Sequence, residues 1–220
     1  MLKNLTIVLI AFCSNWLFAQ NQNTIIDAVK ENDLSSLRIL LDSGENVNAS
    51  DPDGSIALHW AVHNDSLEIT QLLLSAGSQV NAKNRYGVAP LSLAANNGSP
   101  SMVKTLLERG AFANTVMAEE ESVLMTAARA GIEEVVDLLI SAGANVNARE
   151  SWRGQTALMW AAAEGNQKVL ELLISEGADV SARSDKGFTP LLFAAREGET
   201  SIVRSLIESG ASVSEALPSR

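Results

Sequence analysis

The stretch DKGFTPLLFAAREGETSIVRSLIESGAS, residues 185–212, decides the fold. A turn around Gly187 precedes Pro190, and a proline, which has no backbone N–H, is favoured at the first position of a helix. Glycine is a common helix end because it adopts the left-handed conformation without strain. The pattern therefore predicts a short helix from Pro190 to about Arg196 that ends near Gly198.

A second helix is predicted directly after the first. Its apolar residues have the i, i+1, i+4, i+5 spacing of a one-sided stripe, and they are Ile202, Val203, Leu206 and Ile207. Gly210 then provides a C-terminal cap. Neither helix can bury its apolar side alone, so we expect helix pairs of this kind to stack on one another.

Glycines recur along the chain in steps of 33 or 34 residues. The series that ends each second helix is Gly44, Gly77, Gly110, Gly143, Gly177 and Gly210. The series that ends each first helix is Gly98, Gly131, Gly165 and Gly198, and going backwards it reaches Asp65 and Asn32, which also tolerate the left-handed conformation. A turn series is Gly54, Gly87, Gly154 and Gly187. Each 34-residue step falls between the fourth and fifth units, which predicts one inserted residue between Glu150 and Arg153.

These units resemble the ankyrin repeat, whose signature is Gly-x-Thr-Pro-Leu-His-x-Ala-Ala, with Gly-Ala-x-Val-Asn-Ala at the close. The signature appears here as GFTPLLFAA from Gly187, GQTALMWAA from Gly154, GVAPLSLAA from Gly87 and GSIALHWAV from Gly54. The resemblance implies an all-α ankyrin-repeat solenoid of about six stacked helix-turn-helix units with hairpin-like fingers. The expected repeats are residues 22–50 as the N-terminal cap, 51–83, 84–116, 117–150, 151–183 and 184–216 as the C-terminal cap, in one domain spanning 20–220.

Two repeats depart from the signature. The first has no turn, and Thr24 followed by Asp27 suggests a capping box at its start. The fourth has Glu119, Glu120 and Glu121 where the turn glycine is expected, which predicts an irregular and solvated acidic finger.

Residues 1–20, MLKNLTIVLIAFCSNWLFAQ, have the order of a secretory signal peptide: a charge at Lys3, an apolar run and a small residue at Ala19. We expect a signal peptide over 1–19 and an exported chain, periplasmic or secreted, because the ending FAQ resembles bacterial signal peptides. An uncleaved segment, which would hold a membrane-proximal scaffold, is the alternative. Cys13, the only cysteine, lies inside this segment, so the mature chain has no thiol.

Charge and composition exclude several classes of function. Acidic residues outnumber basic ones 26 to 16, and the formal charge is −10, which disfavours nucleic-acid binding. The repeats show no basic amphipathic helix that would bind lipid directly. We expect a monomer that needs no cofactor and binds a protein partner.

The resemblance implies that the turns and first helices line a concave groove, which allows a set of partner-binding residues to be chosen. Aromatic residues and arginine are enriched at the anchors of protein interfaces. The candidates are Trp60, Arg85, Tyr86, Trp152, Arg153, Trp160, Lys186, Phe188, Phe193 and Arg196. For Trp60, Trp160 and Phe193, routine core packing is an equal alternative, and the basic residues suit an acidic patch on the partner.

The chemistry of an enzyme is not indicated. His59 and His63 lie four residues apart and could share a metal, although His59 occupies the histidine position of the signature. No nucleophile elbow, phosphate-binding glycine loop or zinc-protease motif occurs. Glu119 to Glu121 resemble catalytic carboxylates only in composition, so we expect no catalytic activity.

Overall fold

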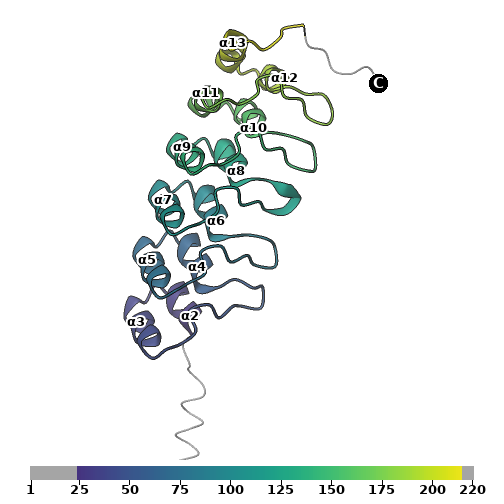
Figure 1. The fold of residues 1–220 in the computed structure, drawn as a ribbon. Helices are drawn as coiled ribbons and strands as arrows, with labels where there is room; N and C mark the ends of the chain where they lie inside the picture. The colour runs from purple at the N-terminus through teal and green to yellow at the C-terminus, as the bar shows by residue number, and fades with distance from the viewer. Residues whose placement is uncertain (1–23, 215–220) are drawn as a thin grey trace, which may run out of the picture.

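The computed structural model describes residues 24–214, and the expected signal peptide over 1–19 lies outside the described residues. Within them twelve α-helices form six pairs (Figure 1). The first helices of the pairs are α2 (Ile25–Lys30), α4 (Ala57–His63), α6 (Pro90–Asn97), α8 (Val123–Ala130), α10 (Ala157–Ala163) and α12 (Pro190–Glu197). The second helices are α3 (Leu34–Asp42), α5 (Leu67–Ser75), α7 (Pro100–Glu108), α9 (Glu133–Ser141), α11 (Gln167–Ser175) and α13 (Thr200–Glu208). A short 3-10 turn, η1 (Ala118–Glu120), lies in the fourth finger.

The pairs stack side by side, first helix against first helix and second against second. Fully buried alanines, which let the backbones approach closely, lie in the stack of first helices: Ala61, Ala94, Ala127, Ala161 and Ala194. The fingers project to one side, and the stack bends toward them (Figure 1). This arrangement confirms the all-α solenoid of helix pairs that the glycine period predicts.

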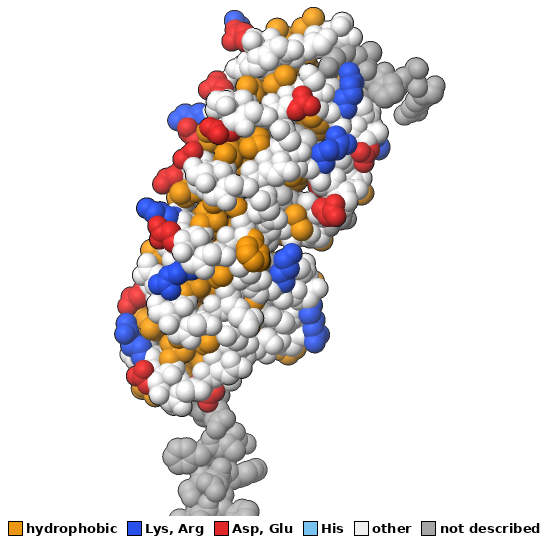
Figure 2. All heavy atoms as spheres, in the orientation of Figure 1, with side chains coloured by type: hydrophobic (Ala, Val, Ile, Leu, Met, Phe, Trp, Pro, Cys, Tyr) orange, Lys and Arg blue, Asp and Glu red, His pale blue; other side chains and the backbone are white. Residues whose placement is uncertain are grey.

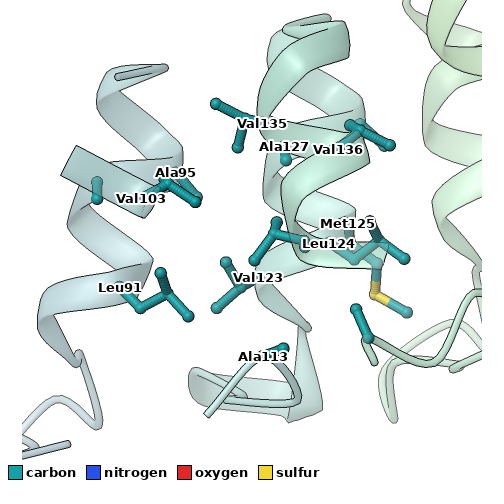
Figure 3. Close-up of a cluster of buried hydrophobic side chains, with 14 of the residues drawn as sticks. Leu91, Ala95, Val103, Ala113, Val123, Leu124, Met125, Ala127, Val135 and Val136 are labelled. Atoms are coloured by element: carbon teal, nitrogen blue, oxygen red, sulfur yellow. The ribbon is translucent and has the colours of Figure 1, made fainter. Parts of the chain in front are cut away.

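A continuous apolar core runs between the pairs. Figure 3 shows its middle, where side chains of the third pair gather against those of the fourth. Leu91 and Val103 come from the third pair, and Val123 and Val135 from the fourth, and all four are buried. The core is shared by neighbouring pairs, as it must be where no pair can bury its own apolar side.

The helix ends follow the sequence pattern. Asn32 and Asp65, which stand in the glycine series, have positive φ angles of 55° and 52°. At the N-terminal end, Asp27 donates its N–H to the hydroxyl of Thr24, and the N–H of Thr24 bonds to the carboxylate of Asp27, both at 3.1 Å. The capping box of the first repeat is therefore present.

The inserted residue lies where the glycine steps place it. In three fingers the turn glycine donates its N–H to the carbonyl three residues earlier, in the pairs Gly54–Asp51, Gly87–Asn84 and Gly187–Ser184. In the fifth repeat Gly154 bonds instead to Glu150, four residues earlier. The wider turn is held by the Glu150 carboxylate, which accepts the N–H groups of Trp152, Arg153 and Gln155 at 2.6 to 3.0 Å.

The expectation of an irregular fourth finger is confirmed at its tip and wrong for its register. At the tip, η1 has a hydrogen bond from the N–H of Glu121 to the carbonyl of Ala118, whereas in three other fingers the turn glycine donates the N–H. Glu120 occupies the position of the turn glycine and adopts its left-handed conformation, with a φ of 59°. Val116 and Ser122 form the same antiparallel bridge that Ser50 and Ile56 form in the second finger. The chain therefore keeps the turn register without the glycine, at the cost of an unfavourable φ for a glutamate.

The expectation of a solvated acidic patch is also wrong for Glu121. Its carboxylate is half-buried, accepts the hydroxyl of Thr126 at 3.0 Å and pairs with Arg129 at 3.5 Å. Glu120 is exposed, and the side chain of Glu119 lies outside the described part of the chain. The pairing of Glu121 with Arg129 ties the finger to α8.

The last repeat leaves apolar surface open at the end of the stack. Ile207 on α13 is 42% exposed and Val213 is 73% exposed, whereas Val47, the counterpart of Val213 in the first repeat, is buried. Within the described residues no further pair covers these side chains.

Candidate interaction surface

The concave side of the stack carries two hollows between fingers and first helices. The larger, which we call the C-terminal hollow, lies between the fifth and sixth repeats and consists of two adjoining cavities of about 290 and 280 Å³. Both cavities are lined by Arg153, Gln155, Phe193 and Arg196. The first extends to Trp160 and Glu164, and the second toward the fingers at Lys186 and Phe188.

Aromatic and basic side chains are interleaved around the C-terminal hollow. The guanidinium carbon of Arg153 lies 3.7 Å from the centre of the Trp152 ring, and Trp152 is 62% exposed. Arg196 lies 5.1 Å from the Phe193 ring, and the Phe188 and Phe193 rings are 5.4 Å apart. A guanidinium stacked on a ring keeps its in-plane N–H donors free for an acceptor.

The second hollow, which we call the N-terminal hollow, lies between the second and third repeats. Its volume is about 260 Å³, and it is lined by Asp53, Ser55, His59, Trp60, His63, Asn84 and Leu93. The indole N–H of Trp60 donates to Asp51 at 2.9 Å, and Lys30 bonds to the same carboxylate at 2.9 Å. Lys30 also lies 4.2 Å from the centre of the Trp60 ring. Trp60 is therefore held by its own repeat and the first one.

Trp160 stands in the fifth repeat where Trp60 stands in the second, but its indole nitrogen is buried and has no hydrogen-bond partner among the described residues. Arg129 lies 5.2 Å over the Trp160 ring, as Lys30 lies over Trp60. Glu150, the counterpart of Asp51, is turned to the N–H groups of the wider turn. The carboxylate at this position therefore has other partners in the fifth repeat and does not satisfy the tryptophan.

The structure brings together six of the ten candidate residues at the C-terminal hollow. They are Arg153, Trp160, Lys186, Phe188, Phe193 and Arg196, with Trp152 stacked on Arg153 at the rim. Trp60 lies at the N-terminal hollow, and Arg85 and Tyr86 are exposed on the third finger. Phe193 is buried in the core, whereas Trp60, Trp160 and Phe188 are half-buried.

Sequence reasoning missed four residues of this region: Glu150, which shapes the finger, and Met159, Ala163 and Ser184, which line the cavities. For Glu150 the sequence does contain a signal, since the 34-residue step in the glycine series falls at its finger. Met159, Ala163 and Ser184 face the cavities only because of the packing of neighbouring repeats.

Comparison with models of protein families decides the classification. The family described as ankyrin repeats, in three copies, matches residues 25–117, 91–184 and 124–216, which together span nearly all of the described residues. The chain belongs to the ankyrin-repeat family. A comparison with curated proteins found no significant match.

Ankyrin repeats are generally protein–protein interaction modules, and the fold is generally a non-catalytic scaffold. In this ankyrin-repeat chain the signature histidine has a structural contact on each ring nitrogen. Nδ1 of His59 accepts the N–H of Ile56 at 3.2 Å, which places the proton on Nε2, 3.1 Å from the carbonyl oxygen of Val88. Burial lowers the pKa of His59 below its ordinary 6.5, more than its backbone hydrogen bonds raise it.

His63 is exposed, and its ring lies edge-on to Trp60 at 6.2 Å. His59 links the second repeat to the third, so it has no free nitrogen for a metal shared with His63. Between residues 24 and 214 no cluster of three histidine, cysteine or acidic side chains has a metal-binding arrangement. In the same range no helix has the length and apolar character needed to cross a bilayer.

An asparagine ladder joins the loops that follow the second helices of this ankyrin-repeat array, which we call the outer loops. Each asparagine donates its amide to a glycine carbonyl in the next repeat, in the pairs Asn48–Gly77, Asn81–Gly110, Asn114–Gly143 and Asn147–Gly177. Ser181 stands at the next position, and among the described residues its hydroxyl makes no such bond to Gly210. The sixth repeat therefore lacks the tie that joins the other outer loops.

Proposed function

We propose that this chain is an exported, non-catalytic binding protein that holds a partner protein in its concave groove, chiefly at the C-terminal hollow. One observation carries the proposal. The two adjoining cavities between the fifth and sixth repeats are lined by exposed basic side chains and by buried or half-buried aromatic ones, and Trp152 is exposed next to them. These residue types are enriched at interface anchors. The N-terminal hollow is a weaker candidate, because its tryptophan is already bonded internally.

The test is capture of the partner by the mature chain, residues 20–220, from envelope and secreted fractions of its source, followed by titration of the purified partner. The variant Trp152→Ala with Lys186→Ala removes exposed groups at the hollow and leaves the core intact. We expect it to bind about tenfold or more weakly, with unchanged helicity by circular dichroism.

A matched control is Phe112→Ala. Phe112 is 66% exposed and lies on an outer loop, away from the groove. Its replacement removes an exposed aromatic ring, as the replacement of Trp152 does. Equal loss of binding in both variants, or loss in neither, contradicts the proposed groove.

We also propose that the chain acts outside the cytoplasm, in the periplasm or the surrounding medium, as a monomer. The proposal of export is supported by the n-region, apolar run and small residue of residues 1–19. Mass spectrometry of the N-terminus of the protein from its source tests it. A chain beginning at Gln20 supports release, and one beginning at Met1 supports instead a scaffold held at a membrane by an uncleaved segment.

A further inference from the structure

Three cations meet at the finger side of the C-terminal hollow with no carboxylate among the residues that line it. The lining residues of this cavity of about 280 Å³ are Arg153, Gln155, Ser184, Lys186, Phe188, Phe193 and Arg196. Like charges gathered around one cavity repel one another, and an anion placed among them relieves that repulsion. The cavity therefore favours a negative group.

The donors of these cations are largely unused. Arg153 and Lys186 make no ion pair within residues 24–214, although Lys30, Arg38, Arg129, Arg149 and Lys168 each pair with a carboxylate there. Arg196 donates its Nε to Glu197 at 2.7 Å, which engages one of its five N–H donors. Guanidinium groups have the fork geometry that matches a carboxylate.

The acidic residues of the region limit where a negative group can sit. Glu164 and Glu197 both line the adjoining cavity on the helix side, and neither lines the finger side. The carboxylate of Glu150 is also close, but it is engaged by the backbone N–H groups of its own turn and does not line either cavity. A ligand carboxylate would be repelled by Glu164 and Glu197 and attracted by Lys186. This arrangement directs it to the space between the fifth and sixth fingers.

The remaining wall of the cavity is apolar. The rings of Phe188 and Phe193 pack 5.4 Å apart with an angle of 44° between their planes, and Phe188 is half-buried. An apolar side chain next to the carboxylate would cover these rings. Peptide segments carry such neighbouring groups, whereas a small inorganic anion does not.

We infer that the groove recognises a linear acidic segment of the partner protein, with an Asp or Glu side chain held among Arg153, Lys186 and Arg196 and an apolar neighbour on Phe188. This inference rests on the proposed groove binding. The excess of acidic residues in the whole chain, 26 against 16 basic, repels a polyanion at longer range and favours a short acidic segment over a nucleic acid.

The test selects binders from a display library of random dodecapeptides on the mature chain. We expect Asp and Glu to be enriched beside apolar residues among the selected peptides. A selected peptide is then synthesised with its acidic residues and with Asn and Gln in their place, and both are titrated. The amide version should bind about tenfold or more weakly, because a hydrogen bond between two charged groups is stronger than one to a neutral amide.

The variant Arg153→Gln with Lys186→Gln should lose the same tenfold for the acidic peptide and little for the amide peptide. The matched control is Lys104→Gln with Arg204→Gln, which makes the same change of net charge at exposed positions of α7 and α13. This control should leave binding unchanged. Raising the salt from low to high concentration should weaken the acidic peptide alone.

Several outcomes overturn the inference. The first two are a library that yields no binder and selected peptides without acidic enrichment. The third is an equal loss of peptide binding in the Arg153→Gln, Lys186→Gln variant and in its Lys104→Gln, Arg204→Gln control. The fourth is tighter binding of single-stranded DNA than of the acidic peptide. If the selected peptides lack acidic residues but no longer bind the Trp152→Ala, Lys186→Ala variant, the acidic segment is overturned and groove binding stands. If the peptides bind that variant and the Arg153→Gln, Lys186→Gln variant as tightly as the unchanged chain, the proposed function is overturned as well.

Discussion

Trp60 donates its indole N–H to Asp51 at 2.9 Å, and the corresponding residues of the fifth repeat make no such bond. The carboxylates at this position have different partners in the two repeats. In the fifth repeat the carboxylate of Glu150, the counterpart of Asp51, bonds to three backbone N–H groups of the wider turn. Trp152 and Arg153 are exposed in this finger, beside the C-terminal hollow.

Replacing Glu150 with alanine should therefore destabilise the protein and disorder the fifth finger. Three backbone N–H groups lose their acceptor, and leaving a buried donor unsatisfied costs about 1–3 kcal/mol. Urea unfolding measures the loss, and partner binding should weaken with it. Glu164→Ala, an exposed glutamate of the same repeat, is the control for stability and should change it little.

Replacing Glu120 with glycine should stabilise the protein by about 1 kcal/mol. Glu120 has a φ of 59°, and the left-handed region costs a side-chain-bearing residue roughly 1–2 kcal/mol, part of which glycine regains at an entropic cost. Gly87→Ala, at the same position of the third finger, should destabilise by a similar amount. Thermal unfolding compares the two variants. If Glu120→Gly destabilises the protein, the backbone of Glu120 is not strained as we infer.

Replacing Ser181 with asparagine should extend the ladder to the sixth repeat. The new amide would bond to the carbonyl of Gly210 as Asn147 bonds to Gly177, and a hydrogen bond is worth about 0.5–1.5 kcal/mol. Slower hydrogen exchange over α13 is the expected result. Asn114→Ser should have the opposite effect in the middle of the array. Unchanged exchange in α13 would show that Ser181 does not limit the last repeat.

Stability should fall as the pH is lowered below about 6.5. Burial lowers the pKa of His59 in the folded state, so the unfolded chain takes up the proton first, and the stability present above 6.5 is lost as the pH falls toward the folded value. Urea unfolding at pH 8, 6 and 5 measures this. His59→Gln should remove this part of the pH dependence, and His63→Gln should keep it. A loss of pH dependence in the His63 variant alone would refute the role of His59.

The regular part of this architecture could be predicted from the sequence, because the glycine period reports backbone conformation directly. The φ angles of Asn32 and Asp65 and the wider turn at Gly154 follow the glycine series residue by residue. The tryptophan contacts could not be predicted in the same way. In each repeat, whether the carboxylate (Asp51 or Glu150) reaches the indole of the tryptophan depends on the shape of the turn. The sequence pattern does not give that shape.

The fourth finger shows the same limit. A missing glycine predicts an irregular turn when the residue is considered alone. Glu121, however, pairs with Arg129 and Thr126, and these contacts accompany a turn that keeps the register of the other fingers despite the strain at Glu120. Side-chain contacts between a finger and its helix are set by packing, and periodicity gives no access to them.

Site-specific photo-crosslinking tests the central claim, binding of a partner protein at the C-terminal hollow, most directly. A photoreactive phenylalanine analogue is placed at Trp152 in one protein and at Phe112 in another, and both are exposed positions. Each protein is then irradiated in the envelope and secreted fractions of its source. The account predicts a discrete crosslinked protein from position 152 and none from position 112. Crosslinks from position 112 alone, or from neither position, would contradict it.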